Sequence, residues 1–238
     1  MSTFTLPGTT LTLNRIGFGA MQLTGPMVWG PPRDRDAALA VVREAVRIGV
    51  NHIDTSDYYG PHVANEIIRD ALHPYPDGVT IVTKVGARRE ADKSWPPAIS
   101  PSEITSAVHD NLRNLQLEAL DVVNLRLGDP RGPNDDSVAK PLRVLIDLQA
   151  QGLIKHIGMS NITPRQFEEG RAMAKIVCVQ NHYNLGFRRD DAFIDELAAQ
   201  GIAYVPYFPL GGFRPLTSTI LDEVASSLGA TPRQVALA

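Results

Sequence analysis

The sequence predicts an α/β fold, a (β/α)8 barrel of the TIM type in which helices surround a ring of parallel strands. Three observations lead to this prediction. Segments of strand length alternate with helix-patterned segments along the whole chain, which is typical of a parallel sheet. The segments VTIVT and IVCVQ are almost continuously apolar, which indicates strands buried on both faces. The length of 238 residues is close to that of a complete barrel, about 250 residues.

The expected elements follow one another in regular order. The segment FTLPGTTLTL predicts a short hairpin that turns at Pro7-Gly8. After it we expect strands at 15–18, 50–55, 79–84, 121–125, 154–159, 176–180 and 202–207. Between and after these strands we expect helices at 35–48, 63–72, 102–115, 138–151, 164–174, 191–200 and 220–228, and a last helical segment from Pro232.

The helices carry clear start and stop signals. The first shows apolar residues at helical spacing, namely Ala38, Val41, Val42 and Ala45. Asp34 or Asp36 is expected to cap it, because a carboxylate accepts the free N–H groups of a first turn. Ser100-Pro101 and Thr163-Pro164 each place a capping side chain before a proline at the first helical position. Glycines stand where a left-handed residue ends a helix, at Gly49, Gly152 and Gly201.

A doubly wound open sheet is the alternative to a barrel. Gly17-Phe18-Gly19 begins like a dinucleotide-binding fingerprint, but Gln22 stands where a third glycine should be and no helix is expected there. The barrel is therefore favoured, as one domain over residues 1–238. Only seven strand–helix units are present, and the chain stops at RQVALA without an eighth strand. We expect a barrel that is incomplete at its C-terminus, with two unpaired strand edges.

Composition excludes several classes of function. The net charge is −3, and the 23 basic and 26 acidic residues are interspersed, so no basic tract is available for a nucleic acid. No apolar run reaches the about 18 residues of a membrane span, and the N-terminus lacks a signal-peptide pattern. The single cysteine, Cys178, excludes an internal disulfide and fits a cytoplasmic protein. No apolar stripe demands a partner, so we expect a monomer.

Polar side chains at the ends of the expected strands suggest acid–base chemistry. Asp54 ends the second strand, Tyr59 lies in the loop after it, and Lys84 ends the third. Carboxyl ends of barrel strands meet at one face, where active sites form. An ammonium lowers the pKa of a nearby phenol, which then protonates a carbonyl oxygen more readily. The hypothesis is that Tyr59 is the acid, Lys84 lowers its pKa and Asp54 orients Lys84.

Other interpretations of these residues remain open. His52 and Asp54 share one side of their strand, as in metal-dependent hydrolases built on barrels. Lys84 and Arg126 at neighbouring strand ends would repel a metal ion, so no metal site is predicted. Each residue alone also has a structural interpretation, such as a loop cap for Asp54. A barrel that binds a cofactor or a partner without catalysis is the other alternative.

Five ordered motifs resemble the aldo-keto reductase superfamily. They are GFGAM at 17–21, DTSDYYG at 54–60, TK at 83–84, IGMSN at 157–161 and QNHYN at 180–184. The resemblance covers the whole chain and implies NADPH-dependent reduction of a small aldehyde or ketone to an alcohol. Longer segments, such as GVNHIDTSDYYGPHVANEIIRDAL and YVPYFPLGGF, are most similar to bacterial pyridoxal reductases, which implies reduction of pyridoxal to pyridoxine.

The resemblance also implies roles for individual residues. Asp54, Tyr59 and Lys84 match three members of the family's catalytic tetrad. The residues implied to hold the cofactor are Gly19, Ala20, Met21, Asp54, Ser160, Asn161, Gln180, Tyr207, Phe208, Leu210, Gly211 and Gly212.

Two features depart from the family pattern. The fourth tetrad position, usually histidine, is Arg126, which donates hydrogen bonds but accepts no proton. We expect Arg126 to polarise the substrate oxygen or to pair with a substrate phenolate. The segment that holds the 2′-phosphate of NADPH in the family is not present, so the NADP preference rests on the resemblance. If the 238 residues are the whole polypeptide, weak cofactor binding and low stability are expected.

Overall fold

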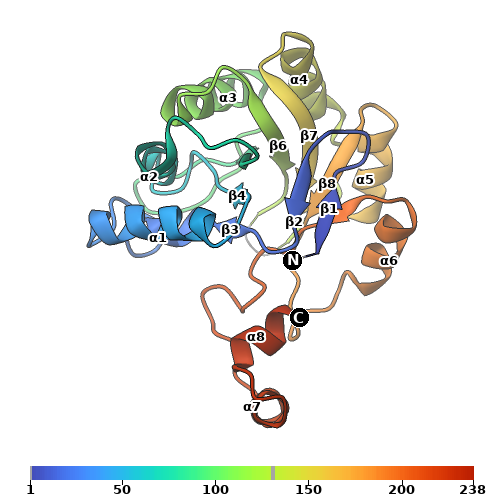
Figure 1. Ribbon diagram of the computed structural model, residues 1–238. Coiled ribbons are helices and arrows are strands. Elements are labelled where there is room, and N and C mark those ends of the chain that lie inside the picture. The colour runs from blue at the N-terminus through green and yellow to red at the C-terminus, as the bar shows by residue number, and fades with distance from the viewer. Residues whose placement is uncertain (1, 130–131) are drawn as a thin grey trace.

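The computed structural model describes residues 2–129 and 132–238. Its main feature is a seven-stranded parallel sheet in which each strand pairs with the next one along the chain, in the order β3-β4-β5-β6-β7-β8-β9 (Figure 1). The strands are β3 Phe18–Gly19, β4 His52–Asp54, β5 Thr80–Val85, β6 Leu120–Arg126, β7 Ile154–Ser160, β8 Ile176–Gln180 and β9 Ala203–Tyr204. This order confirms the parallel sheet that the alternation of strands and helices predicted.

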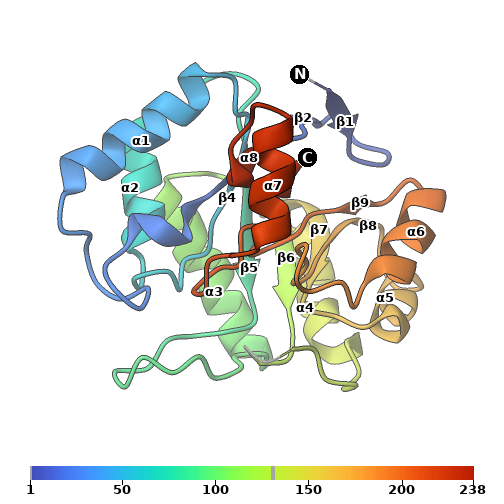
Figure 2. The ribbon, with the colours of Figure 1, turned by 90° about the horizontal axis from the view of Figure 1, so that it is seen from below.

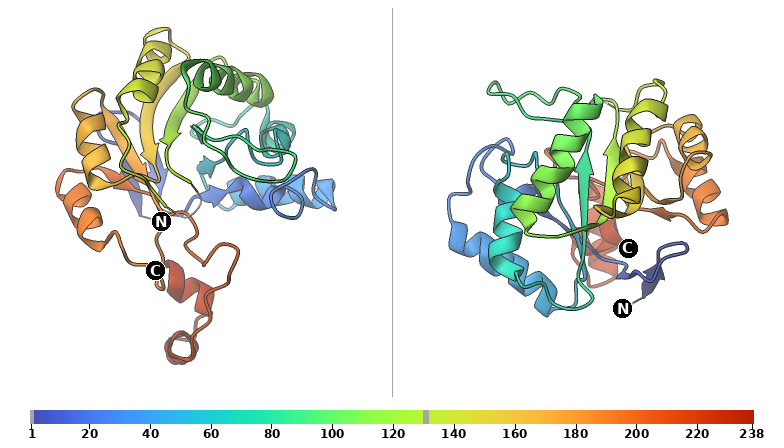
Figure 3. Two further views of the ribbon diagram at one scale, coloured as in Figure 1. Left: turned by 180° about the vertical axis from the view of Figure 1, so that it is seen from behind. Right: turned by 90° about the horizontal axis from the view of Figure 1, so that it is seen from above.

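Helices cover the outer face of the sheet (Figure 3). They are α1 Arg35–Arg47, α2 Val63–Leu72, α3 Pro101–Leu115, α4 Ala139–Ala150, α5 Pro164–Arg171 and α6 Asp191–Ala199. The capping signals act as predicted, since Asp34 accepts from the Ala37 N–H and both Ser100 and Thr163 form reciprocal capping boxes. The glycines that end α1, α4 and α6 adopt the left-handed conformation at Gly49, Gly152 and Gly201.

The sheet is open, as the seven-unit count predicted. β3 and β9 each pair with one neighbour only, so two edges are free in the part of the chain that the structure describes. The last two helices, α7 Thr219–Ser227 and α8 Pro232–Leu237, lie on this open side (Figures 1 and 2). The predicted bounds of both edge strands were wrong, because the ladders there involve only two residues per strand rather than 15–18 and 202–207.

The N-terminal hairpin covers the amino ends of the strands. It consists of β1 Thr3–Thr5 and β2 Thr12–Asn14, and Gly8 in its turn is left-handed with φ 61°, as the Pro7-Gly8 signal predicted. Leu6 and Leu13 are buried against Val82, Val122, Val177 and Cys178 of the sheet. The hairpin therefore fills the amino end of the inner face with apolar side chains.

The inner face changes character along the strands. Because side chains alternate with a period of two, Val82 and Lys84 of β5 point inward while Ile81 and Thr83 point to the helices. The same alternation brings polar side chains inward at the carboxyl ends, namely Asp54, Lys84, Asn124, Arg126, Ser160 and Gln180. The apolar side chains at the amino end of the inner face pack against the hairpin. The polar side chains at the carboxyl end are the candidates for a functional site.

Two further findings concern individual segments. The sequence predicted no helix after Gly19, but a 3₁₀-helix, η1 Ala20–Leu23, begins there. A single 3₁₀ turn needs no long apolar stripe, which explains why periodicity did not reveal it. Within residues 2–129 and 132–238, no helix is long and apolar enough to cross a membrane.

Candidate active site

An ion pair lies at the centre of the polar half of the sheet. The Lys84 ammonium is 2.8 and 2.7 Å from the two carboxylate oxygens of Asp54, and it also donates to the Thr55 carbonyl at 2.9 Å. Lys84 is only 3% exposed, and Asp54 accepts a further hydrogen bond from Gln180 at 3.0 Å. The three donors of the ammonium are therefore fully used. The geometry agrees with the predicted orientation of Lys84 by Asp54.

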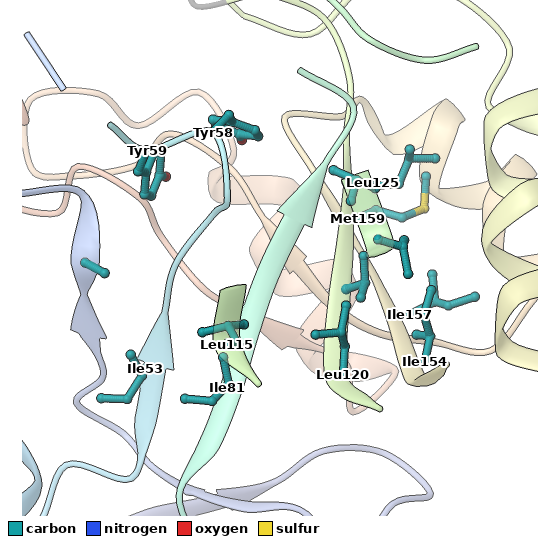
Figure 4. Packing of buried hydrophobic residues seen from close by; sticks show 14 of the residues in the cluster. Ile53, Tyr58, Tyr59, Ile81, Leu115, Leu120, Leu125, Ile154, Ile157 and Met159 are labelled. Atoms are coloured by element: carbon teal, nitrogen blue, oxygen red, sulfur yellow. The ribbon is translucent and has the colours of Figure 1, made fainter. Parts of the chain in front are cut away.

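Tyr59 lies beyond the carboxyl end of β4, beside Tyr58 (Figure 4). Its ring is 8% exposed, and the Lys84 ammonium lies 5.3 Å from its centroid. Within the described chain the structure records no hydrogen bond from the Tyr59 hydroxyl. Burial raises the Tyr59 pKa above its ordinary value, and the Asp54 carboxylate adds to this rise while Arg126 opposes it. Lys84 itself is hydrogen-bonded to Asp54 and Thr55, and its predicted effect on the Tyr59 pKa stays a prediction.

Arg126 is the cation that faces the phenols. It ends β6 next to Ser160, and its guanidinium carbon lies 5.5 Å from the centroid of the Tyr207 ring. Burial acts to lower the Arg126 pKa, but Tyr58, Tyr207 and Tyr59 outweigh it, so the pKa is raised. No carboxylate lies within 4 Å of it in residues 2–129 and 132–238. Its charge is therefore available to a substrate oxygen.

Three buried polar atoms beside the ion pair have no partner among the described residues, namely the Asn124 side-chain nitrogen and two atoms that lie side by side on β7 and β8. The Ser160 hydroxyl and the Gln180 carbonyl oxygen are inaccessible and unbonded, and the two residues are paired across β7 and β8. An unpartnered buried polar atom costs free energy unless a ligand satisfies it. One hydroxyl donor and one carbonyl acceptor, side by side, match the oxygen and the NH₂ of a carboxamide. Ser160 and Gln180, which the resemblance implied to hold the cofactor, therefore fit the carboxamide of a nicotinamide.

Asn161 and Tyr207, which the resemblance implied to hold the cofactor, are hydrogen-bonded to each other. The Asn161 amide donates to the carbonyls of Leu127 and Asp129 at 2.7 and 3.1 Å, and its oxygen accepts from the Tyr207 hydroxyl at 3.0 Å. The Tyr207 ring also stacks on His182, with centroids 5.5 Å apart. In this conformation the Asn161 side chain holds the backbone that follows β6. It would have to break hydrogen bonds to Leu127, Asp129 or Tyr207 before it could bind a nicotinamide ring.

The other residues implied to hold the cofactor border this site. Gly19 ends β3 opposite Asp54, and an added Cβ there would meet nothing within 4 Å. Ala20 is fully buried and Met21 packs against the core. The loop after β9 contains left-handed Phe208, Gly211 and Gly212, at φ 57°, 96° and 65°. A Cβ at Gly211 would lie 2.1 Å from the Arg214 carbonyl, so only glycine fits this turn, and Leu210 lies half-buried within it.

A buried network of polar residues behind the site was not predicted. Asp57, 6% exposed, accepts hydrogen bonds from the side chains of Asn65 and Asn114 at 3.0 and 2.7 Å. Asn65 in turn contacts Thr55 and Asn111 at 2.8 and 2.9 Å, next to the ion pair. The signal for this network was an asparagine on the apolar stripe of each of two helices. Among the described residues, no three His, Cys, Asp or Glu side chains gather as a metal site.

Comparison with known proteins decides the family. A sequence model described as "Aldo/keto reductase family" matches residues 15–238. The chain belongs to the aldo/keto reductase family. Among the family's known members it is 64% identical to "Pyridoxine 4-dehydrogenase" of Escherichia coli, over 100% of this chain and 83% of that protein.

Solved structures show the same fold. A thermostable aldo-keto reductase, Tm1743, crystallised with the inhibitor epalrestat, superposes with a TM-score of 0.82 at 26% identity over 99% of this chain and 84% of that chain. An aldo/keto reductase of Klebsiella pneumoniae, solved with NADP and acetate, gives 0.79 at 22% identity over 99% and 79%, a likeness of fold alone.

The predictions of family and fold are therefore confirmed. This aldo/keto reductase is an oxidoreductase that uses a nicotinamide cofactor to interconvert a carbonyl compound and an alcohol. Family membership also decides against the metal-dependent hydrolase that the sequence had left open.

Proposed function

We propose that this protein reduces pyridoxal to pyridoxine with NADPH. The observation that carries the proposal is a buried phenol, Tyr59, near a guanidinium, Arg126, that has no carboxylate partner in the described chain. Beside them lie an unpartnered hydroxyl donor and an unpartnered carbonyl acceptor, which match the two polar groups of a carboxamide. The 64% identity to the pyridoxine 4-dehydrogenase of Escherichia coli supports the substrate. The net reaction joins pyridoxal, NADPH and one proton to give pyridoxine and NADP⁺.

NADPH bound in this site would supply a hydride for the aldehyde carbon. We assign its carboxamide to Ser160 and Gln180, whose free atoms match it. Gln180 also donates to Asp54 at 3.0 Å, so the same side chain links the cofactor bed to the ion pair. Gly19, Ala20, Met21 and the loop from Tyr207 to Gly212 border this bed, which supports their assignment to cofactor binding.

Tyr59 delivers the proton to the aldehyde oxygen. Because burial and Asp54 raise its pKa, the phenol is protonated at neutral pH. An alkoxide is a stronger base than a phenolate, so it takes the phenolic proton as it forms. Arg126 opposes the rise in the Tyr59 pKa and stabilises the phenolate that remains. Lys84 and Asp54 act as a buried, mutually neutralising pair that shapes the floor of the site.

Arg126 provides selectivity for pyridoxal. Pyridoxal has a phenolic oxygen next to its aldehyde, and Arg126 has no carboxylate partner in the described chain. A guanidinium presents several donors in one plane, which suits a phenolic oxygen and the oxygen of the aldehyde on the adjacent ring carbon. Histidine at this position would offer one donor. The departure from the family pattern at Arg126 therefore supports a substrate with a neighbouring phenolate.

The test is NADPH titration followed by pyridoxal-dependent loss of NADPH absorbance. We expect Tyr59→Phe to reduce kcat by about 100-fold or more, the contribution of one general acid. Arg126→Met should raise the KM for pyridoxal at least tenfold but change the KM for pyridine-4-carbaldehyde, which lacks the hydroxyl, by less than threefold. Full activity of Tyr59→Phe would refute the assignment of the acid.

The alternative of a barrel that binds without catalysis is decided by the same titration. NADPH binding with no pyridoxal-dependent turnover would favour that alternative. Replacing Ser160 with Ala should weaken NADPH binding while leaving the melting temperature in its absence unchanged or higher, because the change removes an unpartnered buried hydroxyl.

We also propose that residues 1–238 form one domain and that the protein is a cytoplasmic monomer. The single cysteine is buried and its pKa is raised to about 12 by burial, as expected of an inert core thiol. Sedimentation at several protein concentrations tests the monomer, and a single unfolding transition tests the domain.

A further inference from the structure

Arg89 is a buried cation without a counterion. It lies in the loop between β5 and α3, is 9% exposed, and has no Asp or Glu within 4 Å in the part of the chain that the structure describes. Its Nε is buried without a partner. Burying an unpaired charge costs free energy, and an apolar side chain of similar length would fill the same space at lower cost. Its role is therefore better explained by what it contacts than by stability.

One set of contacts leads to the loop that follows η1. The guanidinium donates to the carbonyls of Val28 and Met27, both at 2.9 Å, and to that of Lys93 at 3.2 Å. Met27 and Val28 are both left-handed, at φ 61° and 56°. This conformation is strained for a β-branched residue such as Val28. Arg89 therefore stabilises a backbone that these residues would not adopt alone.

That loop is bonded to the segment that carries Tyr59. The Gly30 N–H donates to the Gly60 carbonyl at 2.8 Å, and Trp29 forms a parallel bridge with Gly60. Gly60 directly follows Tyr59. A change in the conformation of Met27 and Val28 would therefore move the residue next to the phenol.

The other set of contacts leads to Tyr59 through an aromatic ring. The Arg89 guanidinium carbon lies 3.8 Å from the centroid of Trp95 and 5.5 Å from that of Trp29. Trp95 packs edge-on against Tyr59, with centroids 6.3 Å apart, and against Tyr58 at 5.8 Å. Both routes from Arg89 thus converge on Tyr59, one through its backbone neighbour and one through its ring.

We propose that Arg89 is a positioning residue that fixes the orientation of the Tyr59 phenol through Trp95 and through the backbone of Met27 and Val28. The inference rests on the proposed function, in which Tyr59 delivers the proton. A shift of about 1 Å in a catalytic group reduces rates by up to about 100-fold. Loss of Arg89 should therefore lower kcat and leave NADPH binding unchanged, because its hydrogen bonds and ring contacts in the described part of the chain involve none of the residues assigned to the cofactor.

The test is a double-mutant cycle for NADPH-dependent pyridoxal reduction. We expect Arg89→Met to lower kcat about tenfold in the wild-type protein and less than twofold in a Tyr59→Phe background, because a phenol that is already absent cannot be misplaced. The matched control is Arg88→Met. Arg88 is 48% exposed, pairs with Glu90 and Glu103 outside the site, and should be replaceable without loss of kcat.

An equal loss of kcat in both backgrounds, or no loss in either, would overturn the inference. If Arg89→Met does not fold, Arg89→Lys gives the same comparison, since lysine keeps the charge but lacks the planar face that stacks on Trp95. It should lower kcat in the wild-type protein and not in Tyr59→Phe. Full activity of Tyr59→Phe alone would instead refute the proposed acid, which is a distinguishable result.

Discussion

The Nδ1 atom of His62 lies 2.6 Å from the Oδ2 atom of Asp57, and this contact joins the start of α2 to the loop that carries Tyr58 and Tyr59. Asp57 is 6% exposed and also accepts from Asn65 and Asn114, so the loop is held from two helices at once. His62 is left-handed at φ 68°, which aims its ring back at the carboxylate. The catalytic loop is therefore connected to a histidine whose pKa the contact with Asp57 raises above its ordinary value.

The first prediction concerns the pH dependence of stability. The bond to Asp57 raises the pKa of His62 in the folded protein, so folding favours the protonated form. This contribution is full below the unfolded pKa of about 6.5 and is lost as the pH rises through the higher folded pKa. We expect His62→Gln to destabilise the protein at pH 5.5 but little at pH 8.5, by less than about 1 kcal/mol because the ring is half exposed.

Urea denaturation of both proteins at the two pH values measures this difference. In an Asp57→Asn background, the effect of His62→Gln should lose its pH dependence. If His62→Gln destabilised the protein equally at pH 5.5 and 8.5, the His62–Asp57 contact would not be coupled to protonation of the imidazole.

The second prediction concerns the Asp54–Lys84 pair. Lys84 is 3% exposed, and removing it leaves the Asp54 carboxylate without its cation. Breaking one side of a buried pair costs about 3–5 kcal/mol, whereas replacing both sides costs much less. We expect Lys84→Met to destabilise by about that amount and Asp54→Asn/Lys84→Met to recover at least half of it. Guanidinium denaturation measures the free energies of unfolding. A double variant that is destabilised by the sum of the two single substitutions would contradict this expectation.

The sequence predicts much of this fold because the relevant signals are local. The proline after Ser100 and the period of two that turns Lys84 inward depend on near neighbours only, and the structure agrees with both. The bounds of β3 and β9 depend on which strand lies beside them, which no local pattern records. The direction of the Tyr59 pKa likewise depends on burial of the phenol and on where Asp54 and Arg126 lie around it, which no local pattern records.

The residues that sequence analysis missed act over long separations in the chain. Arg89 bonds to Val28, 61 positions earlier, and Asp57 bonds to Asn114, 57 positions later. Neither contact follows from a motif, since arginine and asparagine are common in surface loops and on helices. The family resemblance identifies only residues that match the family's motifs. It could not predict Arg89 or Asn114, which contact the loops around Tyr59 from positions outside those motifs.

The third prediction concerns Gly158 of β7. An added Cβ would lie 2.1 Å from the Asn124 side-chain oxygen and 2.6 Å from the Cys178 sulfur, which bond each other at 3.4 Å. Overpacking of this kind costs about 1–3 kcal/mol. We expect Gly158→Ala to destabilise within this range and Asn124→Ala to relieve part of the cost in the double variant. Gly19→Ala, with no atom within 4 Å of its Cβ, is the control for stability. Equal stability of both alanine variants would contradict the packing argument.

The fourth prediction concerns the alkaline limit of the reductase activity. Reduction needs the protonated phenol, so the rate falls as the pH rises through the Tyr59 pKa. Burial and the Asp54 carboxylate raise that pKa, so kcat of the wild-type protein should not decline up to pH 9.5. Asp54→Asn removes one cause of the rise, and the fall in kcat should move to lower pH, by about 1 unit.

Arg126 provides the opposing control, because its charge lowers the Tyr59 pKa. Adding Arg126→Met to Asp54→Asn should return the alkaline fall of kcat towards higher pH, even though the KM for pyridoxal rises. The measurement is kcat at saturating pyridoxal and NADPH from pH 6 to 10. An alkaline fall that appears at the same pH in the wild-type protein and in Asp54→Asn would show that a group other than Tyr59 limits the proton transfer. If removing the Asp54 charge moves the alkaline fall of kcat to lower pH and removing the Arg126 charge moves it to higher pH, the titrating group is the Tyr59 phenol, whose pKa both residues affect.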